Sequence, residues 1–435
     1  MTPYSEYKDS GMEWIGEIPK GWSIEKLGRH VELHQGTQVS LEKQFFDSNL
    51  NRVRFLRISD FTMNPEPRFI ESKCTNHQIN HRNLVVIRYG ENAGSVFSGE
   101  EGVLANNLFS IRVRTHNLNQ RYLLLFLQQE IVFRLLRFGN ENTAMPQISH
   151  SKIHNLFLPC PPLSEQTQIV SFLDTKTQQI DELIQNKERK IKLLQEKRTA
   201  VINQAVTKGL NPEVEMKDSG VEWIGEIPKG WDLVSIKHLV STKLTDGHHE
   251  TPNFVDDGIP FISVESVRGN IIDFDFKRGY ITKESHEYYS KKCKPKRDDV
   301  LLVKSGSTTG KSTIVETDTE FNIWSPLCLI RSKKELVTPR FMFISLQSSY
   351  FFRFIETGWS YGTQPNIGMG VIENIQIITP SLPEQTKIVS YLDTKTQQFD
   401  DLISKEQRKI ELLKEYRQSL ISDAVTGKID VREAV

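Results

Sequence analysis

Two stretches of the chain place apolar residues at a spacing close to a heptad over more than three repeats. In the first stretch successive apolar positions are 4, 7, 4, 7 and 3 residues apart, and the second stretch repeats this pattern. Such spacing is typical of a coiled-coil seam, the alternative being a helix that packs only on its own globular domain. We predict two long helices that pair along a seam of Ile169, Leu173, Ile180, Ile184, Ile191, Leu194, Ile388, Leu392, Phe399, Ile403, Ile410 and Leu413.

Proline and glycine mark the ends of both helices. Pro161 and Pro162 precede the first helix and Pro383 stands at the start of the second, while Gly209 and Gly427 follow their ends. Proline is favoured in the first turn of a helix and glycine just past its last turn. At 1.5 Å per residue, each helix is a rod of roughly 60 Å.

The chain is an internal repeat with constant and variable parts. The segment KDSGMEWIGEIPKGW (8–22) returns at 217–231 with one change in fifteen positions, and the helical segment 165–207 returns at 384–426 with 27 of 43 positions identical. The parts between them, 23–164 and 232–383, share almost no letters. We therefore interpret the two constant regions as a structural framework and the two variable regions as recognition domains for different targets.

The two variable parts share an order of predicted elements. Each has short runs rich in β-forming residues, then an apolar helical stretch (121–136; 340–355), then a loop with AMPQIS or TQPNIG. The predicted strands lie within 53–59, 83–89, 107–114, 258–264, 299–304 and 327–332. We expect both variable parts to have the same α/β fold with different surface residues.

These elements give an α+β architecture with an internal pseudo-twofold repeat. We divide the chain into a variable domain (1–162), a long helix (163–210), a second variable domain (211–382) and a second long helix (383–435). The repeat alone allows either orientation of the helix pair, because a folded domain intervenes. We adopt the antiparallel intramolecular coiled coil, which puts one variable domain at each end of the rod.

Composition excludes several classes of protein. The 435 residues include 55 Lys and Arg and 55 Asp and Glu, and no apolar run approaches the roughly 18 residues of a membrane span. The first residues lack the apolar core of a signal peptide, so we expect a cytoplasmic protein without a membrane partner. The four cysteines stand singly, which predicts reduced, mostly buried thiols and no zinc knuckle: Cys74, Cys160, Cys293 and Cys328.

Positive charge is local. Between Arg52 and Arg88 there are seven basic and three acidic residues, and between Lys277 and Lys304 there are nine basic and four acidic residues. A single charge run is usually a solvated face, but both variable domains carry one, which favours phosphate-facing surfaces.

Catalytic motifs are weak. KSGSTTGKST (304–313) misses the phosphate-binding loop because Ser305 replaces its first glycine, so a nucleotide-binding enzyme is the weaker alternative. His248 and His249 are adjacent, and adjacent residues rarely share one metal. We expect no catalytic residues and no metal site; a coiled-coil scaffold with protein- or glycan-binding end domains is a third possibility.

The order of these blocks resembles the specificity subunits of type I restriction-modification systems. The resemblance rests on the GEIPKGW opening and on the helix starts PPLSEQTQIVSFLD (161–174) and PSLPEQTKIVSYLD (380–393). TDGHHETP (245–252) and QPNIG (364–368) resemble the target-recognition domains of that family, and the DGHH-type loop is missing from the first variable domain.

The resemblance implies a non-catalytic subunit in which each variable domain recognises one half of a split site in double-stranded DNA. The paired helices would set the spacer and dock methyltransferase subunits, two in number, which supply S-adenosylmethionine chemistry and flip adenines; restriction subunits would add ATP and Mg²⁺. Arg and Lys suit guanine edges and phosphates. The candidates for DNA contact are Arg52, Arg54, Arg57, Arg68, Arg82, Arg88, His248, Lys277, Arg278, Lys291, Lys292, Lys294 and Lys311.

Overall fold

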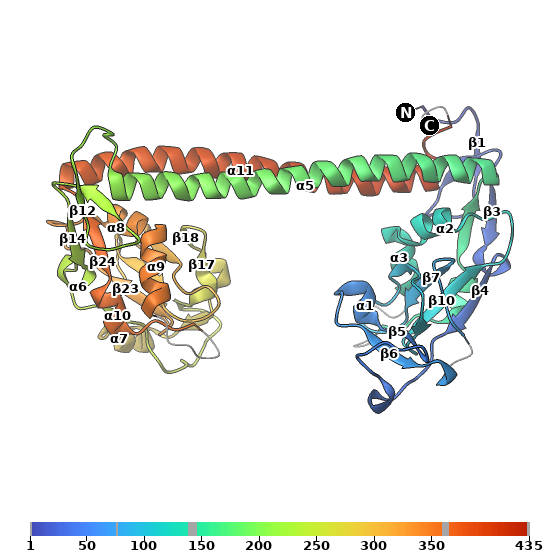
Figure 1. Ribbon diagram of the computed structural model, residues 1–435, viewed down its shortest axis with the longest axis horizontal. Helices are drawn as coiled ribbons and strands as arrows, with labels where there is room; N and C mark the ends of the chain where they lie inside the picture. Colours follow the sequence, from blue (N-terminus) through green and yellow to red (C-terminus); the bar gives the residue numbers. More distant parts are fainter. Residues whose placement is uncertain (1, 75–76, 138–145, 359–364, 433–435) are drawn as a thin grey trace. The chain divides into compact units, whose positions relative to one another are not determined.

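The computed structural model describes residues 2–74, 77–137, 146–358 and 365–432, without the side chain of Cys74. The chain forms two compact units (Figure 1). Unit 1 comprises Met1–Lys187 with Arg408–Val435, and unit 2 comprises Glu188–Gln407. Each unit therefore combines one variable domain with parts of both long helices, α5 (Leu163–Lys208) and α11 (Leu382–Val425). The division into four segments at 162, 210 and 382 stays a prediction.

The variable domain of unit 1 contains two sheets and a strand pair. One sheet has the order β4-β10-β7-β8 and the other β6-β5-β9, in which β5 and β9 are parallel, while β11 pairs with β3. The strands are β3 (Ser23–Lys26), β4 (Val31–Gln35), β5 (Arg52–Leu56), β6 (Arg68–Glu71), β7 (Asn83–Ile87), β8 (Val96–Ser98), β9 (Val103–Leu104), β10 (Leu108–Val113) and β11 (Phe157–Cys160). The helices are α1 (Ile58–Thr62), α2 (Gln120–Leu127), α3 (Glu130–Arg137) and α4 (His150–His154), with 3₁₀ turns at Leu27–Arg29, Leu41–Lys43 and Ser72–Cys74.

The variable domain of unit 2 repeats both sheets and the strand pair of unit 1, and it adds one further pair, β17 with β18. Its sheets have the orders β15-β23-β20-β21 and β19-β16-β22, with β16 parallel to β22, while β14 pairs with β24 and β17 with β18. The strands are β14 (Asp232–Ser235), β15 (Thr245–Asp246), β16 (Ile259–Ile262), β17 (Val267–Arg268), β18 (Ile271–Ile272), β19 (Gly279–Ile281), β20 (Val300–Val303), β21 (Ser312–Ile314), β22 (Asn322–Ile323), β23 (Leu327–Ile330) and β24 (Gln376–Thr379). The helices are α6 (Ile236–Leu239), α7 (Lys283–Ser290), α8 (Pro339–Ser345), α9 (Ser349–Gly358) and α10 (Met369–Asn374), with 3₁₀ turns at Val264–Ser266 and Phe274–Phe276. The expectation of one fold with two surfaces is confirmed.

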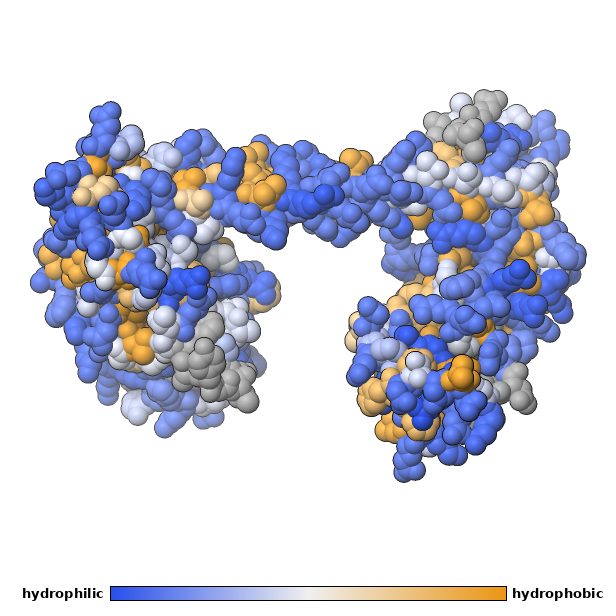
Figure 2. Space-filling view, viewed as in Figure 1, coloured by the Kyte–Doolittle hydropathy of each residue, from blue (hydrophilic) through white to orange (hydrophobic). Residues whose placement is uncertain are grey.

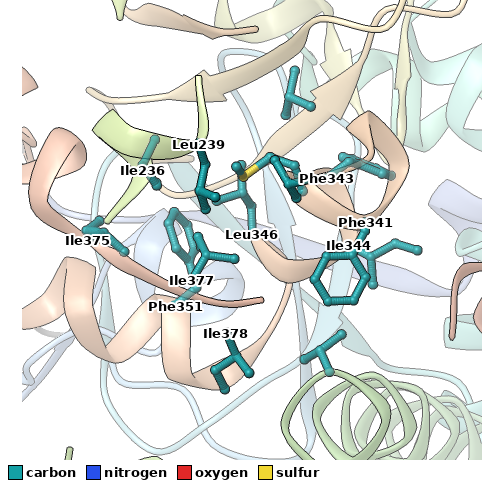
Figure 3. Close-up of a cluster of buried hydrophobic side chains, with 14 of the residues drawn as sticks. Ile236, Leu239, Phe341, Phe343, Ile344, Leu346, Phe351, Ile375, Ile377 and Ile378 are labelled. Atoms are coloured by element: carbon teal, nitrogen blue, oxygen red, sulfur yellow. The ribbon is translucent and has the colours of Figure 1, made fainter. Parts of the chain in front are cut away.

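The predicted apolar helical stretch of each variable domain is two helices, not one. In unit 2 the stretch forms α8 and α9, which together with α6 and β24 enclose the core shown in Figure 3. Helix α8 is buried from Phe341 to Ser345 and keeps Arg340 partly exposed at its start, whereas α9 buries only one face. A mostly buried helix and a helix with one apolar stripe need different surroundings, and the chain turns between them.

The long helices pair antiparallel within each unit. In unit 2, Lys190 Nζ lies 2.9 Å from Glu406 and Arg198 Nε lies 3.0 Å from Asp400, so partners on α11 come earlier as α5 proceeds. In unit 1, Arg417 Nε lies 3.0 Å from Asp181. Arg417 and Asp181 are the repeat equivalents of Arg198 and Asp400, which confirms the antiparallel orientation and the pseudo-twofold repeat. The twelve predicted seam residues are all buried or half-buried.

In each unit, the repeated hairpin segment contacts the start of the repeated long helix. The first block forms a hairpin of β1 (Tyr7–Asp9) and β2 (Glu17–Pro19) in unit 1, and of β12 (Met216–Asp218) and β13 (Glu226–Pro228) in unit 2. The tryptophan that closes the hairpin donates from Nε1 to the glutamate that opens the long helix: Trp22 to Glu165 at 3.1 Å, and Trp231 to Glu384 at 3.3 Å.

No helix in the described part of the chain combines the length and apolar content that crossing a lipid bilayer requires. The thiols of Cys160, Cys293 and Cys328 are buried and unbridged, as predicted, whereas the side chain of Cys74 lies outside the described residues.

Candidate nucleic-acid interface

A tight glycine loop follows the first strand of the main sheet in both variable domains. A Cβ on Gly36 would lie 2.1 Å from the carbonyl oxygen of Ala105, and one on Gly247 would lie 2.1 Å from that of Ile323. The residue after each glycine forms a parallel bridge, Thr37 with Ala105 and His248 with Trp324. The expectation that the DGHH-type loop is missing from the first domain is therefore wrong for the backbone: QGTQ (35–38) takes its place with different side chains.

In unit 2 this loop lies against aromatic and basic side chains. The ring of His248 lies 4.3 Å from that of Tyr289 and 5.7 Å from that of Tyr288, between centroids. Arg278 lies 4.5 Å above the ring of Trp324, close enough for a cation–π contact. Within the described residues, Nδ1 of His248 and Nε1 of Trp324 are buried and lack a hydrogen-bond partner. A buried polar atom without a hydrogen bond costs free energy, so these two atoms favour a ligand that supplies the missing hydrogen bonds.

A basic groove of about 940 Å³ adjoins the loop in unit 2. Its lining includes six basic side chains and two acidic ones, Asp246 and Glu373; the basic residues are Lys243, Lys291, Lys292, Lys294, Lys296 and Arg331. A concave surface of one sign concentrates its field on an anion such as a phosphate. Four of the nine basic residues in the 277–304 run therefore share this groove with Lys243 and Arg331.

Asp246 holds one lysine of the groove, Lys292, and the neighbouring Lys304 in place. Its carboxylate accepts from Lys292 at 2.7 Å and lies 3.1 Å from Lys304 Nζ. Burial alone raises the pKa of Asp246, but the hydrogen bonds and charges of the two lysines outweigh burial and lower it. Lys292 is therefore committed to the base of the loop. Lys294 is likewise paired with Glu320 at 2.6 Å.

The other candidate DNA-contact residues of unit 2 differ in whether they are already paired within the protein. Arg278 is paired with Glu265. Lys277 donates to the carbonyl of Phe274 at 3.2 Å and lies 4.7 Å from the ring of Tyr280. Lys291 and Lys311 are exposed. The structure thus brings His248, Arg278, Lys291 and Lys292 to one region.

In unit 1 two of the predicted arginines are structural. Arg54 and Arg57 each lie 2.9 Å from Asp60, whose side chain is fully buried and also accepts from the Arg57 backbone at the start of α1. Burial tends to raise the pKa of Asp60, but these hydrogen bonds lower it. Arg54 and Arg57 therefore fix α1 and have little freedom to reach DNA.

The remaining arginines of unit 1 stack on aromatic rings or are exposed. The guanidinium groups of Arg52 and Arg68 lie 3.5 Å from the rings of Phe45 and Phe46. Arg52 is also paired with Asp47, and Phe46 is half exposed. Arginine stacked on an aromatic ring is a surface that suits nucleic-acid bases. Arg82 is exposed, and Arg88 lies 4.7 Å from the ring of Tyr89.

Sequence reasoning found Arg88 but missed the polar cluster to which it belongs in unit 1. His34, Arg88, Asn107 and His150 each have a buried polar atom without a partner among the described residues. Burial, then the charge of Arg88, lowers the pKa of His150. These residues come from β4, the end of β7, the start of β10 and α4, so only the sheet order brings them together. The one local signal was a histidine or asparagine at the end of an apolar run.

The glycine-rich motif KSGSTTGKST is a turn, not a phosphate-binding loop. Gly310 has φ +92° and donates its N–H to Val303 at 2.8 Å, and the chain continues into strand β21. A phosphate-binding loop leaves its amides free and opens a helix. Gly94 in unit 1 makes the same turn, with φ +97° and a 2.8 Å bond to Ile87. The interpretation of this motif as a phosphate-binding loop is therefore wrong.

Histidine and cysteine side chains form local contacts. His249 Nε2 lies 3.1 Å from Asp246, while the ring of His248 packs at a tilt against Tyr289, so the adjacent histidines have different partners. In unit 1, Glu25, His30 and Cys160 place possible ligand atoms within 4.8 Å of one another. His30 already pairs with Glu25 at 2.8 Å, and burial raises the pKa of the Cys160 thiol to about 12, so we assign no metal there.

The long helices expose leucines at repeat-equivalent positions. Leu183 and Leu412 are 49% and 47% exposed in unit 1, and their equivalents Leu402 and Leu193 are 42% and 61% exposed in unit 2. Apolar patches interrupt the hydrophilic surface of the helices in Figure 2. Exposed leucines therefore recur at equivalent positions in both units.

Comparison with known proteins identifies the family. The model of the type I restriction modification DNA specificity domain matches residues 19–193 and 228–412. The chain is 23% identical over 438 residues to the type I restriction enzyme MjaVIII specificity subunit of Methanocaldococcus jannaschii, covering 99% of this chain and 98% of the relative. It is 22% identical to the EcoBI specificity subunit of Escherichia coli, covering 88% and 81%.

A solved structure from a study of complex assembly in the type I R-M system has the same fold. It superposes with a TM-score of 0.70 at 17% identity, covering 95% of this chain and 99% of the other. The duplicated fold, the shared glycine loops and the match of both halves to one domain model agree. The chain belongs to the family of type I restriction-modification DNA specificity subunits.

Proposed function

We propose that this chain selects the DNA sequence for a type I restriction-modification complex, with each variable domain reading one half of a two-part site. The observation that carries the proposal is one backbone with two sets of side chains. At the bridge beside the glycine loop, unit 1 has Thr37 and Ala105 where unit 2 has His248 and Trp324. Different donors, acceptors and sizes at one position read different base edges.

The proposed role is recognition without chemistry. The chain acts in the cytoplasm and leaves methyl transfer to partner subunits, which carry S-adenosylmethionine, ATP and Mg²⁺. In support, the glycine-rich turn lacks the form of a nucleotide site, and the three buried thiols of the described chain have a raised pKa. A protonated, buried thiol is a poor nucleophile.

The helix pair is the proposed ruler between the two half-sites and the docking site for two methyltransferase subunits. The repeat-equivalent leucines support two similar docking sites, one formed by Leu183 and Leu412 and the other by Leu402 and Leu193. Restriction subunits join the assembly outside this core. Support for these partners comes from the named relatives, which are specificity subunits of restriction enzymes.

The proposed base readers lie against aromatic rings, even where they also have an acidic partner, whereas the proposed backbone contacts are exposed. Exposed Arg82, Lys291 and Lys311 are proposed phosphate contacts, because extended charged side chains position a protein on DNA without reading its sequence. His248 with Arg278 in unit 2, and Arg52 with Arg68 in unit 1, are proposed to face bases. Arg54, Arg57, Lys292 and Lys294 act within the protein.

The test is to map methylated bases in DNA from cells that carry this chain with its partner subunits. The proposal predicts a motif of two short specified sequences separated by an unspecified spacer of fixed length. A continuous motif, or methylation that does not depend on this chain, contradicts the proposal.

A further inference from the structure

Each long helix begins with a Glu-Gln pair whose glutamine is fully buried against the variable domain of its own unit. Gln166 and Gln385 are 0% exposed. The Oε1 atom of Gln166 accepts from the backbone N–H of Asn119 at 2.8 Å. Its Nε2 donates to the backbone carbonyls of Asn117 at 2.9 Å and Pro161 at 2.8 Å. The side-chain amide thus uses both its hydrogens and its oxygen.

Gln385 makes the same three bonds in unit 2. It accepts from the backbone N–H of Thr338 at 2.8 Å and donates to the carbonyls of Leu336 and Pro380, both at 2.9 Å. The variable domains share almost no letters here: Asn-Leu-Asn in one is Leu-Val-Thr in the other. The glutamine forms these hydrogen bonds only with backbone atoms, so they do not depend on the side chains that differ.

The bound segment is the start of the helix that leads into each domain core. Asn119 caps α2, its side chain accepting from Arg121 and Tyr122, and Thr338 caps α8 by accepting from Phe341. One residue into the helix, Arg121 is paired with Asp174 of α5 at 2.8 Å. Arg340 is paired with Asp393 of α11 at 2.9 Å. The glutamine fixes where the core helix begins, and the ion pair fixes its direction.

We propose that Gln166 and Gln385 are positioning residues that set the pose of each reading domain on its long helix without reading the side chains of that domain. This inference rests on the proposed function. A domain held only a fraction of an ångström or a few degrees away presents its reading loops wrongly to the base edges, while the other domain is unaffected. Backbone-only docking also explains how one constant helix start carries two diverged domains.

The test uses the full chain in complex with its methyltransferase subunits and the variants Q166M and Q385M. Methionine keeps the length and removes all three hydrogen bonds, leaving buried backbone groups unpaired. Discrimination is the ratio of methylation rates on the specified duplex and on a duplex with one base changed in one half. The half read by each domain is first assigned with a chain carrying one exchanged domain.

Q166M is expected to lower discrimination at least about tenfold in the half read by the first domain, and to leave the other half within about twofold. Q385M is expected to do the converse. The control N117A should change neither half, because only the backbone oxygen of Asn117 is used. Equal losses in both halves, or no loss in either, would overturn the proposal, because a general loss of stability acts on both halves alike.

Hydrogen exchange on the unmodified chain gives a second measurement that needs no variant. The amides of Asn119 and Thr338 precede their helices and have no helical acceptor, so only the glutamines protect them. We expect them to exchange at least about a hundredfold more slowly than exposed loop amides, and exchange at the loop rate overturns the docking. A wild-type complex that methylates no two-part site refutes the proposed function instead, and the exchange measurement still decides on the docking.

Discussion

Individual residues show how one backbone carries two specificities. The glycine loops of the two domains have the same backbone arrangement because no side chain fits at Gly36 or Gly247. The residues that follow are free to differ, and they do: Thr37 and His248. Sequence patterns predicted the basic residues but not which of them are committed to Asp60 and Asp246, because ion pairing depends on chain segments brought together by the sheets. For the same reason, the sequence did not predict that ring nitrogens of His34 and His150 are buried without a hydrogen-bond partner among the described residues.

The glycine loops give a first prediction. G36A and G247A each push a Cβ against a backbone carbonyl that cannot rotate away, so each should destabilise its unit by at least about 2 kcal/mol. Thermal or urea unfolding measures the change. The matched controls are G21A and G230A, where a Cβ meets nothing within 4 Å, and they should stay near the wild type. Equal stability of G36A and G21A would show that the loop is not as tight as described.

The pH dependence of stability follows from Asp246. Its pKa is lowered below the ordinary 3.8 in the folded protein, so its pairing stabilises the fold above that pH and is lost as the pH falls through the lowered value. D246N should therefore be about 1–3 kcal/mol less stable than wild type at pH 7. The gap should close below about pH 4.

Denaturant unfolding at a series of pH values measures this gap for D246N. The control D256N changes an exposed carboxylate and should differ little from wild type at any pH. A D246N deficit that stays constant down to pH 3 would mean that the two lysines do not depend on this charge.

The sequence predicted the helices and strands better than it predicted the side-chain contacts. The long helices and their seam follow from periodicity, and each of the six marked runs contains a strand; the run 53–59 ends early because α1 begins at Ile58. Each apolar helical stretch folds as two helices: α2 and α8 bury most of their residues, while α3 and α9 bury one face. Local pattern gives the apolar content of such a stretch, but tertiary packing decides where it turns.

The helix pair yields a prediction about register. Deleting one heptad from α5 alone should break pairs such as Arg198 with Asp400 and weaken assembly, because every later seam residue loses its partner. Deleting the equivalent heptad from both helices should restore pairing. It should also shorten the rod by about 10 Å, or about three base pairs of DNA. Methylation mapping reads the spacer, and an unchanged spacer in the doubly deleted chain contradicts the ruler.

The whole molecule is neutral, and much of its local positive charge is paired within the chain. Among the predicted contacts, Arg52, Arg54, Arg57, Arg278, Lys292 and Lys294 all have acidic partners. This pairing reduces the number of cations that can release counterions from DNA. The sequence predicted the neutrality and the local runs, whereas the extent of pairing appeared only with the folded chain.

We therefore predict that the isolated chain binds DNA weakly and with a shallow dependence on salt, while the complex with methyltransferase subunits binds tightly and with a steep one. Titrations of labelled duplex at about 50 and 200 mM salt measure both slopes. Nanomolar binding by the chain alone at 200 mM salt would mean that its own surface suffices.

The central claim is that two independent readers sit on one constant frame. The most direct measurement is to replace residues 23–164 with the variable domain of another family member and to map methylated bases in cells carrying the chimaera and the partner subunits. The account predicts that one half of the motif changes, while the other half and the spacer stay the same. A change in both halves, or in neither, would contradict it.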